Sequence, residues 1–221
     1  MKLIDISLPI HNNMWSYKPQ WQNNIELFES TMKDGMSTIY KLTVYSHTGT
    51  YIETSSHKLK SELLLSELSL DSFYRKVKVV VVNEKQLITK NKVSNELEIT
   101  GLKLVSGDAV IIANGYGENH KREDYLSASP SFEPELTDWL ASLNLGLLGV
   151  DTPIIENLAA PYQPVVNLFN ANPALLLLAP LKIDTNEVKS GEYTLSCFPL
   201  NIEETTGMLC RAILIDAKSK D

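Results

Sequence analysis

The feature that most constrains the fold is a series of short apolar runs separated by turn residues. KVKVVVVN (76–83) and AVIIANG (109–115) are rich in β-branched residues and bounded by polar ones. Such runs are typical of strands buried on both faces of a sheet, because a half-exposed strand alternates polar and apolar residues. Further strand candidates follow at LGLLGVDTP (145–153) and ALLLLAPLKI (174–183).

Other segments add strands and few helices. Residues 2–10 alternate, which predicts a strand stopped by Pro9. Residues 37–54 are rich in Thr, Tyr, Val and Ile, which predicts one or two strands. Strands are also expected in 193–202 and 209–216, whereas 11–21 has no period and indicates a loop.

A helix is expected within 129–144, where Ser131 is a candidate N-cap. Its apolar face comprises Leu136, Trp139, Leu140 and Leu143. Residues 61–74 could hold a short helix. Because strands dominate and no linker or repeat is visible, we expect one α/β domain over 1–221 with a mixed, strand-rich sheet and few helices.

Composition excludes several classes of protein. A hydrophobic content of 43% is enough for a packed core, and a formal net charge of −7 argues against a nucleic-acid partner. Cys197 and Cys210 are too few for a disulfide framework and are expected to be reduced core residues. No leader sequence is visible, and no apolar stretch is long enough to cross a bilayer, so we expect a cytoplasmic protein without a membrane partner.

The stretch SHTGTYIETSSH (46–57) carries the clearest chemistry. It contains His47 and His57, two of the four histidines of the chain, with Glu53 between them. Imidazole nitrogens and carboxylate oxygens suit zinc or manganese, and they also suit general acid–base catalysis. Tyr51 stands where a further donor would be expected.

Five landmarks in order resemble the cyclase family that includes bacterial kynurenine formamidase and isatin hydrolase. They are IDISLPI, the hallmark stretch from His47 to His57, SGDAVIIANG, LGLLGVDTP and FPLNIEETTGMLCRAILI. The resemblance implies a swivelling β/β/α domain and a homodimer or larger homo-oligomer with the active site near a subunit interface. It also implies hydrolysis of small amide or lactam substrates by metal-activated water.

Compared residue by residue with the family hallmark, this chain departs from the pattern. His47 matches the first metal ligand, Tyr51 replaces a ligand histidine, and Glu53 replaces a ligand aspartate. Ser55 replaces a proline, which predicts a looser loop, and His57 matches a histidine that the family uses in proton transfer. A neutral phenol is a poor ligand for zinc.

The second half of the family's ligand set is missing. Alignment of LLLLAPLKI with the family's glutamate-bearing strand places Ala179 at the glutamate and Asn167 near the histidine. No histidine follows His120. A catalytic zinc usually has three protein ligands, so His47, Glu53 and His57 would suffice only if His57 were recruited.

Three interpretations follow. The favoured one is a metal-independent enzyme that cyclises, dehydrates or hydrolyses a small carbonyl-containing metabolite, with no cofactor and a role in secondary metabolism. His57 would act as general base or acid, Tyr51 as a hydrogen-bond donor or acid, and Glu53 would orient a histidine such as His47. The second is a metal-dependent amidohydrolase in which His47, Glu53 and His57 hold zinc or manganese. The third is a non-catalytic small-molecule binder or partner subunit.

Residues outside the hallmark complete the expected site. Trp15, Tyr17 and Trp21 are expected to form an aromatic wall for a small-molecule substrate. Asp151 is interpreted as a scaffold residue, and Glu156 could face the site. The remaining histidines, His11 and His120, lie in polar segments and are expected to be solvated.

Overall fold

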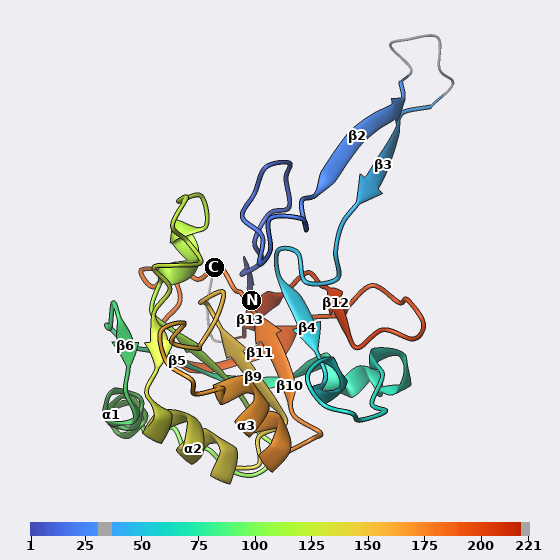
Figure 1. Ribbon diagram of the computed structural model, residues 1–221. Helices are drawn as coiled ribbons and strands as arrows, with labels where there is room; N and C mark the ends of the chain where they lie inside the picture. Colours follow the sequence, from blue (N-terminus) through green and yellow to red (C-terminus); the bar gives the residue numbers. More distant parts are fainter. Residues whose placement is uncertain (31–36, 218–221) are drawn as a thin grey trace.

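A nine-stranded mixed sheet organises the molecule (Figure 1), whose computed structural model describes residues 1–30 and 37–217. In order across the sheet its strands are β1 (Lys2–Asp5), β13 (Ile213–Asp216), β11 (Gly191–Ser196), β5 (Tyr74–Val81), β7 (Ala109–Ala113), β9 (Leu147–Val150), β10 (Leu176–Ala179), β4 (Tyr51–Glu53) and β12 (Gly207–Leu209). The four central strands, β5, β7, β9 and β10, are parallel, and the flanking pairs are antiparallel. The mixed, strand-rich α/β fold expected from the sequence is confirmed.

Two small ribbons lie beside this sheet. In one, β2 (Asn24–Glu29) pairs with β3 (Ile39–Thr43), and in the other, β6 (Leu87–Ile88) pairs with β8 (Ser131–Phe132). The expected strands within 37–54 are therefore β3 and β4. Figure 1 shows the ribbon of β2 and β3 projecting from the body of the molecule.

The apolar strands alternate between two hydrophobic cores, one on each face of the sheet. In β7, Val110 and Ile112 belong to the core beneath the helices, whereas Ala109 and Ile111 belong to the opposite core. All four side chains are at most 2% exposed. Burial on both faces explains why this segment is a continuous apolar run rather than an alternating one.

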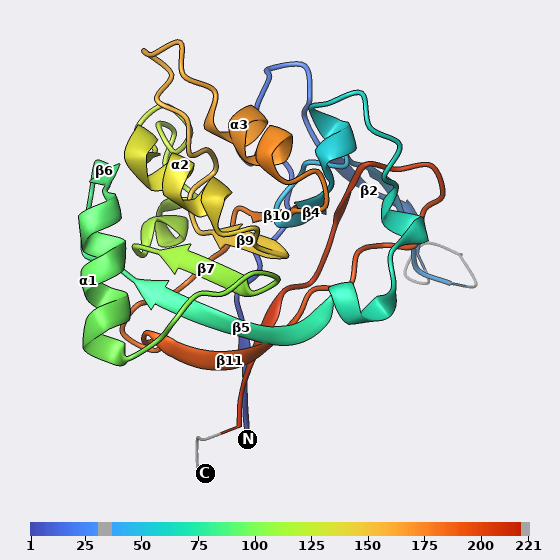
Figure 2. The same ribbon diagram turned by 90° about the horizontal axis from the view of Figure 1, so that it is seen from below.

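The described residues contain three α-helices, α1 (Lys90–Thr100), α2 (Pro134–Ser142) and α3 (Pro164–Ala171), which cover one face of the sheet (Figure 2). Few helices were expected, and few are present. None of them is long and apolar enough to span a membrane. The 61–74 segment forms two short 3₁₀ turns, Leu65–Glu67 and Leu70–Ser72, in place of a helix.

The cap proposed for α2 was wrong. Ser131 lies in β8, and the helix begins at Pro134 after Glu133 as N-cap. Proline suits this first position because its missing N–H would have no partner within the helix. The apolar face was correct: Leu136 and Leu140 are at most 1% exposed, and the other two members pack against the same core.

Asp151 ties the ends of two parallel strands together, as expected of a scaffold residue. It follows β9, is fully buried, and accepts hydrogen bonds from the backbone N–H of Asn114 at 3.0 Å and of Gly115 at 2.7 Å, just after β7. Burial raises the pKa of its carboxyl group to about 7, although the backbone N–H donors oppose that rise. The next residues along the chain reach the pocket described below.

Replacing this carboxylate tests its structural role. In Asp151→Asn an amide –NH₂ replaces one acceptor oxygen opposite two backbone donors, so we expect the free energy of unfolding to fall by roughly 1–3 kcal/mol. Urea denaturation measures the change, with the exposed Asp71→Asn as the matched control. Equal stability of the two variants would contradict this role.

Candidate active site

Strand β4 positions the hallmark residues by simple alternation. Ile52 is fully buried in the core away from the helices, so Tyr51 and Glu53 point to the other face. The strand lies between β10 and β12, with Glu53 opposite Leu177 on one side and Gly207 on the other. Both functional side chains are therefore held by backbone pairing on two sides.

His47 reaches Glu53 because the chain turns sharply between them. Gly49 makes this turn with φ of 62°, a left-handed conformation that favours glycine. The Nε2 atom of His47 lies 3.0 Å from Oε2 of Glu53, whose residue is 2% exposed. On the opposite edge of the ring, Nδ1 lies 2.8 Å from the Ser46 hydroxyl, so both ring nitrogens have a partner.

His57 approaches the same carboxylate from a 3₁₀ turn, Ser55–His57, that follows β4. Its Nε2 lies 3.8 Å from Oε2 of Glu53, and its ring centroid lies 4.0 Å from that of His47. Burial lowers the pKa of His57 to about 4. The nearby Glu53 carboxylate opposes this shift, whereas His47 and Lys58 add to it. The imidazole is therefore neutral at pH 7.

The loop carrying His57 is held firmly, contrary to the expectation from the missing proline. Ser55 is fully buried, and its hydroxyl donates a hydrogen bond to the carbonyl of Pro173 at 2.7 Å. The preceding Thr54 hydroxyl donates to the carbonyl of Leu63 at 2.8 Å. Hydrogen bonds to distant backbone thus replace the rigidity of a proline ring.

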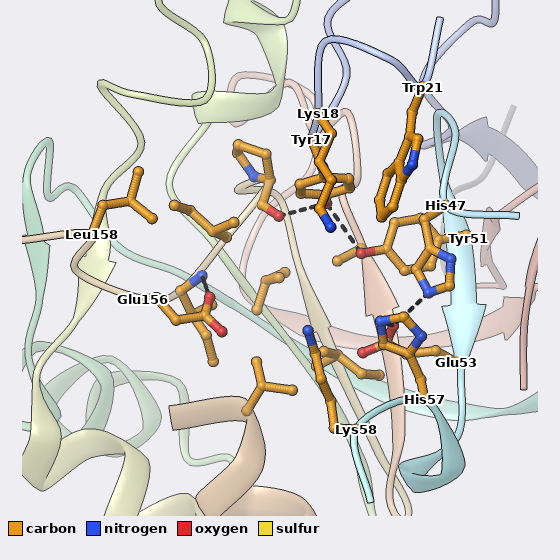
Figure 3. A pocket seen from close by; sticks show the side chains of 17 residues that line it. Tyr17, Lys18, Trp21, His47, Tyr51, Glu53, His57, Lys58, Glu156 and Leu158 are labelled. Atoms are coloured by element: carbon orange, nitrogen blue, oxygen red, sulfur yellow. Dashed lines mark hydrogen bonds and ion pairs between the residues drawn. The ribbon is translucent and has the colours of Figure 1, made fainter. Parts of the chain in front are cut away.

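Together, His47, Glu53 and His57 form a group that could hold a metal ion. One potential ligand atom from each lies within 4.8 Å of the others. These atoms come from a loop, a strand and a 3₁₀ turn, and they meet at the wall of a pocket of about 570 Å³ (Figure 3). The hallmark residues predicted from the sequence are therefore brought together in space.

The rest of the pocket is mostly apolar. Its other lining residues are Tyr17, Lys18, Trp21, Tyr51, Lys58, Val150, Pro153, Ile154, Ile155, Glu156, Leu158, Val165, Leu177 and Ala179. They come from the loop before β2, from β4 and the turn after it, from the end of β9 and the segment that follows, and from α3 and β10. Apolar walls with a few convergent polar groups are typical of a small-molecule site.

Tyr51 and Tyr17 form a hydrogen-bond chain with a defined direction. The Tyr17 hydroxyl donates to the carbonyl of Pro153 at 2.7 Å, and it lies 3.1 Å from the Tyr51 hydroxyl. Because a carbonyl can only accept and Tyr17 has one proton, Tyr51 must donate to Tyr17. Burial raises the pKa of Tyr51 well above its usual value, so a neutral phenol presents its lone pairs to the pocket.

Trp15 does not line this pocket, although it was grouped with Tyr17 and Trp21. Its ring lies behind Tyr17, at a centroid distance of 5.0 Å, and it also contacts Tyr125 at 5.1 Å. Trp15 therefore supports the wall from behind. Trp21 is in the wall itself, as expected.

Some of the other sequence-based expectations agree with the structure, and others do not. Glu156 faces the pocket, and Ala179 lies there beside its strand partner Tyr51, whereas Asn167 is not among the lining residues. His120 was expected to be solvated, but it is 6% exposed, and its Nδ1 lies 3.1 Å from the carbonyl of Gly117. His11 is exposed, as expected.

Sequence reasoning missed two cations at the pocket, Lys18 and Lys58. Lys58 directly follows the hallmark histidine His57, and Lys18 follows Tyr17, so proximity in sequence was the signal for both. The apolar residues after β9 were also missed, because their placement depends on how the chain turns after Asp151.

Gly207 makes room for the histidine–carboxylate contact, and substituting it tests that geometry. A Cβ at this position would lie 2.9 Å from Cε1 of His47 and 3.2 Å from Cβ of Glu53. The His47 ring is held by hydrogen bonds at both nitrogens, and Glu53 lies on a strand that is paired on both sides. Because neither can move away easily, we expect Gly207→Ala to lower the free energy of unfolding by roughly 1–3 kcal/mol. Gly191→Ala in β11 is the control, since its Cβ would meet only Tyr193 at 3.8 Å. Urea denaturation of both variants decides the matter, and equal stability would argue against the tight fit.

Known proteins resemble this chain along most of its length. Kynurenine formamidase of Bacillus cereus is 24% identical over 216 residues, which cover 96% of each chain. Kynurenine formamidase of Erythrobacter litoralis is 27% identical and covers 89% of this chain and 87% of its own. These relatives agree with the resemblance drawn from the five landmarks.

Solved structures share the fold. Isatin hydrolase A from Ralstonia solanacearum matches with a TM-score of 0.80 at 16% identity and covers 97% of this chain and 92% of its own. A structure described as a potential metal-dependent hydrolase with cyclase activity matches with a TM-score of 0.78 at 19% identity, covering 99% of both chains. The comparisons support the expectation of a cyclase-type or hydrolase-type enzyme.

The family model named Cyclase matches residues 4–157, from β1 through the hallmark stretch to the pocket segment after β9. This match extends over more than half of the chain. The protein therefore belongs to the Cyclase family.

Proposed function

We propose that the protein hydrolyses a small amide or lactam, with a divalent metal ion held by His47, Glu53 and His57. The observation that carries the proposal is the convergence of two imidazole nitrogens and one carboxylate oxygen within 4.8 Å at the pocket wall. Relatives named kynurenine formamidase and a structural neighbour described as a potential metal-dependent hydrolase point to the same class.

The three residues fit a metal ion chemically. Two histidines and a carboxylate are a frequent ligand set of catalytic zinc, which leaves a further position open. A histidine must be neutral to bind a metal, and the lowered pKa of His57 keeps it neutral at pH 7. The Ser46 hydroxyl can accept a hydrogen bond from Nδ1–H of His47, the kind of outer contact that orients a ligand histidine.

A bound zinc or manganese ion would supply a water nucleophile at neutral pH and would polarise the attacked carbonyl. The chain itself would bind and orient the substrate. Tyr51 accepts a hydrogen bond because its proton is committed to Tyr17, so an amide or lactam N–H is a better partner than an ester oxygen. Trp21 and the apolar segment 153–155 would pack against the rest of the substrate.

Metal-independent acid–base catalysis is the second candidate. The 3.0 Å contact between His47 and Glu53 supports it, because a carboxylate that orients a histidine is a common catalytic pair. Two observations weigh against it. The pKa of His57 is about 4 and that of Tyr51 is well above its usual value, so both lie far from neutrality, where proton transfer is most efficient.

A metal-binding test separates the two candidates. After treatment with a chelator, the wild-type protein is expected to bind zinc or manganese in calorimetry and to hydrolyse N-formylkynurenine or isatin only with metal restored. We expect His47→Ala and His57→Ala to weaken metal binding by at least about 100-fold, because loss of an outer contact alone costs about 10- to 100-fold. His11→Ala, at an exposed histidine, is the control.

Tyr51→Phe should keep the metal affinity and raise KM for an amide by about tenfold, because one hydrogen bond to the substrate is lost. Turnover that survives metal removal but fails in His57→Ala would instead favour the metal-independent candidate. The identity of the natural substrate, and with it a role in secondary metabolism, stays a prediction.

We also propose that the chain forms a homodimer through the ribbon of β2 and β3. Its apolar side chains are exposed: Phe28 is 65% exposed, Tyr40 is 59% and Leu42 is 61%. A two-stranded ribbon alone is marginally stable in water, so a second surface is expected to cover these side chains. The ribbon leads directly into the hallmark stretch, which would couple assembly to the site.

Charges on the ribbon test the dimer. Phe28→Asp combined with Leu42→Asp should halve the molar mass measured by light scattering after gel filtration, because charges cannot be buried unpaired in an apolar interface. Ile99→Asp, at a residue of α1 that is 79% exposed, controls for added charge. A wild-type protein that already elutes as a monomer would overturn the proposal.

A further inference from the structure

We infer that Lys18 and Lys58 form a binding subsite for an anionic group of the ligand at the mouth of the pocket. The inference rests on the proposed function in placing the reacting carbonyl beside His47, Glu53 and His57. It adds that the ligand carries, or acquires on hydrolysis, a carboxylate or a similar anion.

The backbone of Lys58 is fixed by a hydrogen bond, whereas its ammonium group forms no ion pair within the described residues. Its backbone N–H donates to the carbonyl of Ser55 at 3.0 Å, which closes the 3₁₀ turn that carries His57. Figure 3 shows its side chain extending from below His57 into the pocket. The turn that places His57 beside Glu53 therefore also places the ammonium group of Lys58 at the pocket.

Lys18 is positioned from the opposite side. Its Nζ lies 4.7 Å from the centroid of the Trp21 ring, a cation–π contact, and Trp21 in turn stacks on Tyr45 at 5.8 Å. The ring holds the ammonium without neutralising its charge. Figure 3 shows Lys18 above the pocket, on the side away from Lys58.

Neither ammonium is paired with a carboxylate in the described part of the chain. The ion pairs there involve other lysines, arginines and the hallmark histidines. At the pocket, Glu53 is already engaged by His47 and His57, and Glu156 accepts a hydrogen bond from the backbone of Ile155 at 3.2 Å. Two unpaired cations therefore remain.

The positions of Lys18 and Lys58 contrast with the negative net charge of the chain, which disfavours the approach of an anion. The formal net charge is −7, and most of the pocket wall is apolar. Both lysines are exposed, so solvent and salt screen each charge, and the attraction for an anion comes from two ammonium groups that line the same pocket. The two ammonium groups supply the local attraction that the chain as a whole lacks.

A matched pair of probes tests the subsite without relying on turnover. Benzenesulfonate and methyl phenyl sulfone differ by one charge and little in shape, and the sulfonate stays ionised at every working pH. Their dissociation constants are measured by titration of the metal-loaded full chain, followed through the fluorescence of Trp21. Trp21→Phe identifies the part of the signal that comes from the pocket.

We expect the wild type to bind the sulfonate more tightly than the sulfone, and high NaCl to reduce that preference. Lys18→Gln combined with Lys58→Gln should weaken sulfonate binding by about tenfold and leave sulfone binding unchanged, because a charge-assisted contact is lost. Lys60→Gln, at an exposed lysine outside the pocket, should change neither. Equal binding of the two probes by the wild type, or equal losses for both in the double variant, would overturn the inference.

Kinetics with isatin and isatin-5-sulfonate then identify the source of the anion. A KM that rises in the double variant only for the sulfonated lactam indicates an anion carried by the substrate. Weaker product inhibition with both lactams indicates the carboxylate formed on ring opening. Loss of metal binding in the wild type would remove the proposed function, whereas the preference for sulfonate over sulfone would persist, so the two failures are distinguishable.

Discussion

The buried carboxylate of Glu53 governs the arrangement around it. A charged group removed from water is costly unless it has partners, and Glu53 is 2% exposed at the end of a strand that is paired on both sides. The strand cannot shift to expose it. Two histidines therefore come to the carboxylate, one from a glycine turn before β4 and one from a 3₁₀ turn after it. The opposing strand carries a glycine because any larger residue would separate them.

The hydrogen bonds from Tyr51 to Tyr17 and from Tyr17 to Pro153 fix the orientation of the Tyr51 hydroxyl in this pocket. From the sequence, the resemblance to the family predicts that Tyr51 replaces a ligand histidine. In the structure its proton is fixed by Tyr17 and Pro153, and Ala179 lies directly opposite it on β10. Tyr51 and Ala179 are thus neighbours, and a large side chain lies beside a small one. The pocket gains a hydrogen-bond acceptor of fixed orientation.

Sequence reasoning succeeded where one local pattern determines the outcome. Doubly buried strands need continuous apolar runs, so β7, β9, β10 and the second half of β5 were identifiable. Two helices, α1 and α3, were not anticipated. The first has a clear N-cap at Thr89 and a glycine C-cap at Gly101, signals that were not read, and it buries only Val93 and Leu97. Because α1 has only a weak apolar face, its two caps were the main evidence in the sequence for a helix.

Side-chain environments at the site were harder to predict than strands. Ser55 was expected to loosen its loop, yet the carbonyl it binds belongs to Pro173, more than a hundred residues away. The burial of His120 and the place of Trp15 behind Tyr17 likewise depend on segments that are distant in sequence. Patterns in a single segment contain no information about such partners, whereas the hallmark residues were identifiable because they lie on one strand and its two flanking turns.

The position of β4 has a consequence for how the protein is made. Its backbone partners are β10 and β12, which a ribosome synthesises long after the hallmark stretch has left the exit tunnel. Until those strands arrive, Tyr51 and Glu53 have no neighbours on either side, and closing such long loops is slow because of its entropic cost. The site therefore cannot assemble before β10 and β12 have been synthesised. A nascent chain would hold exposed histidines and a carboxylate that are not yet arranged to capture a metal ion.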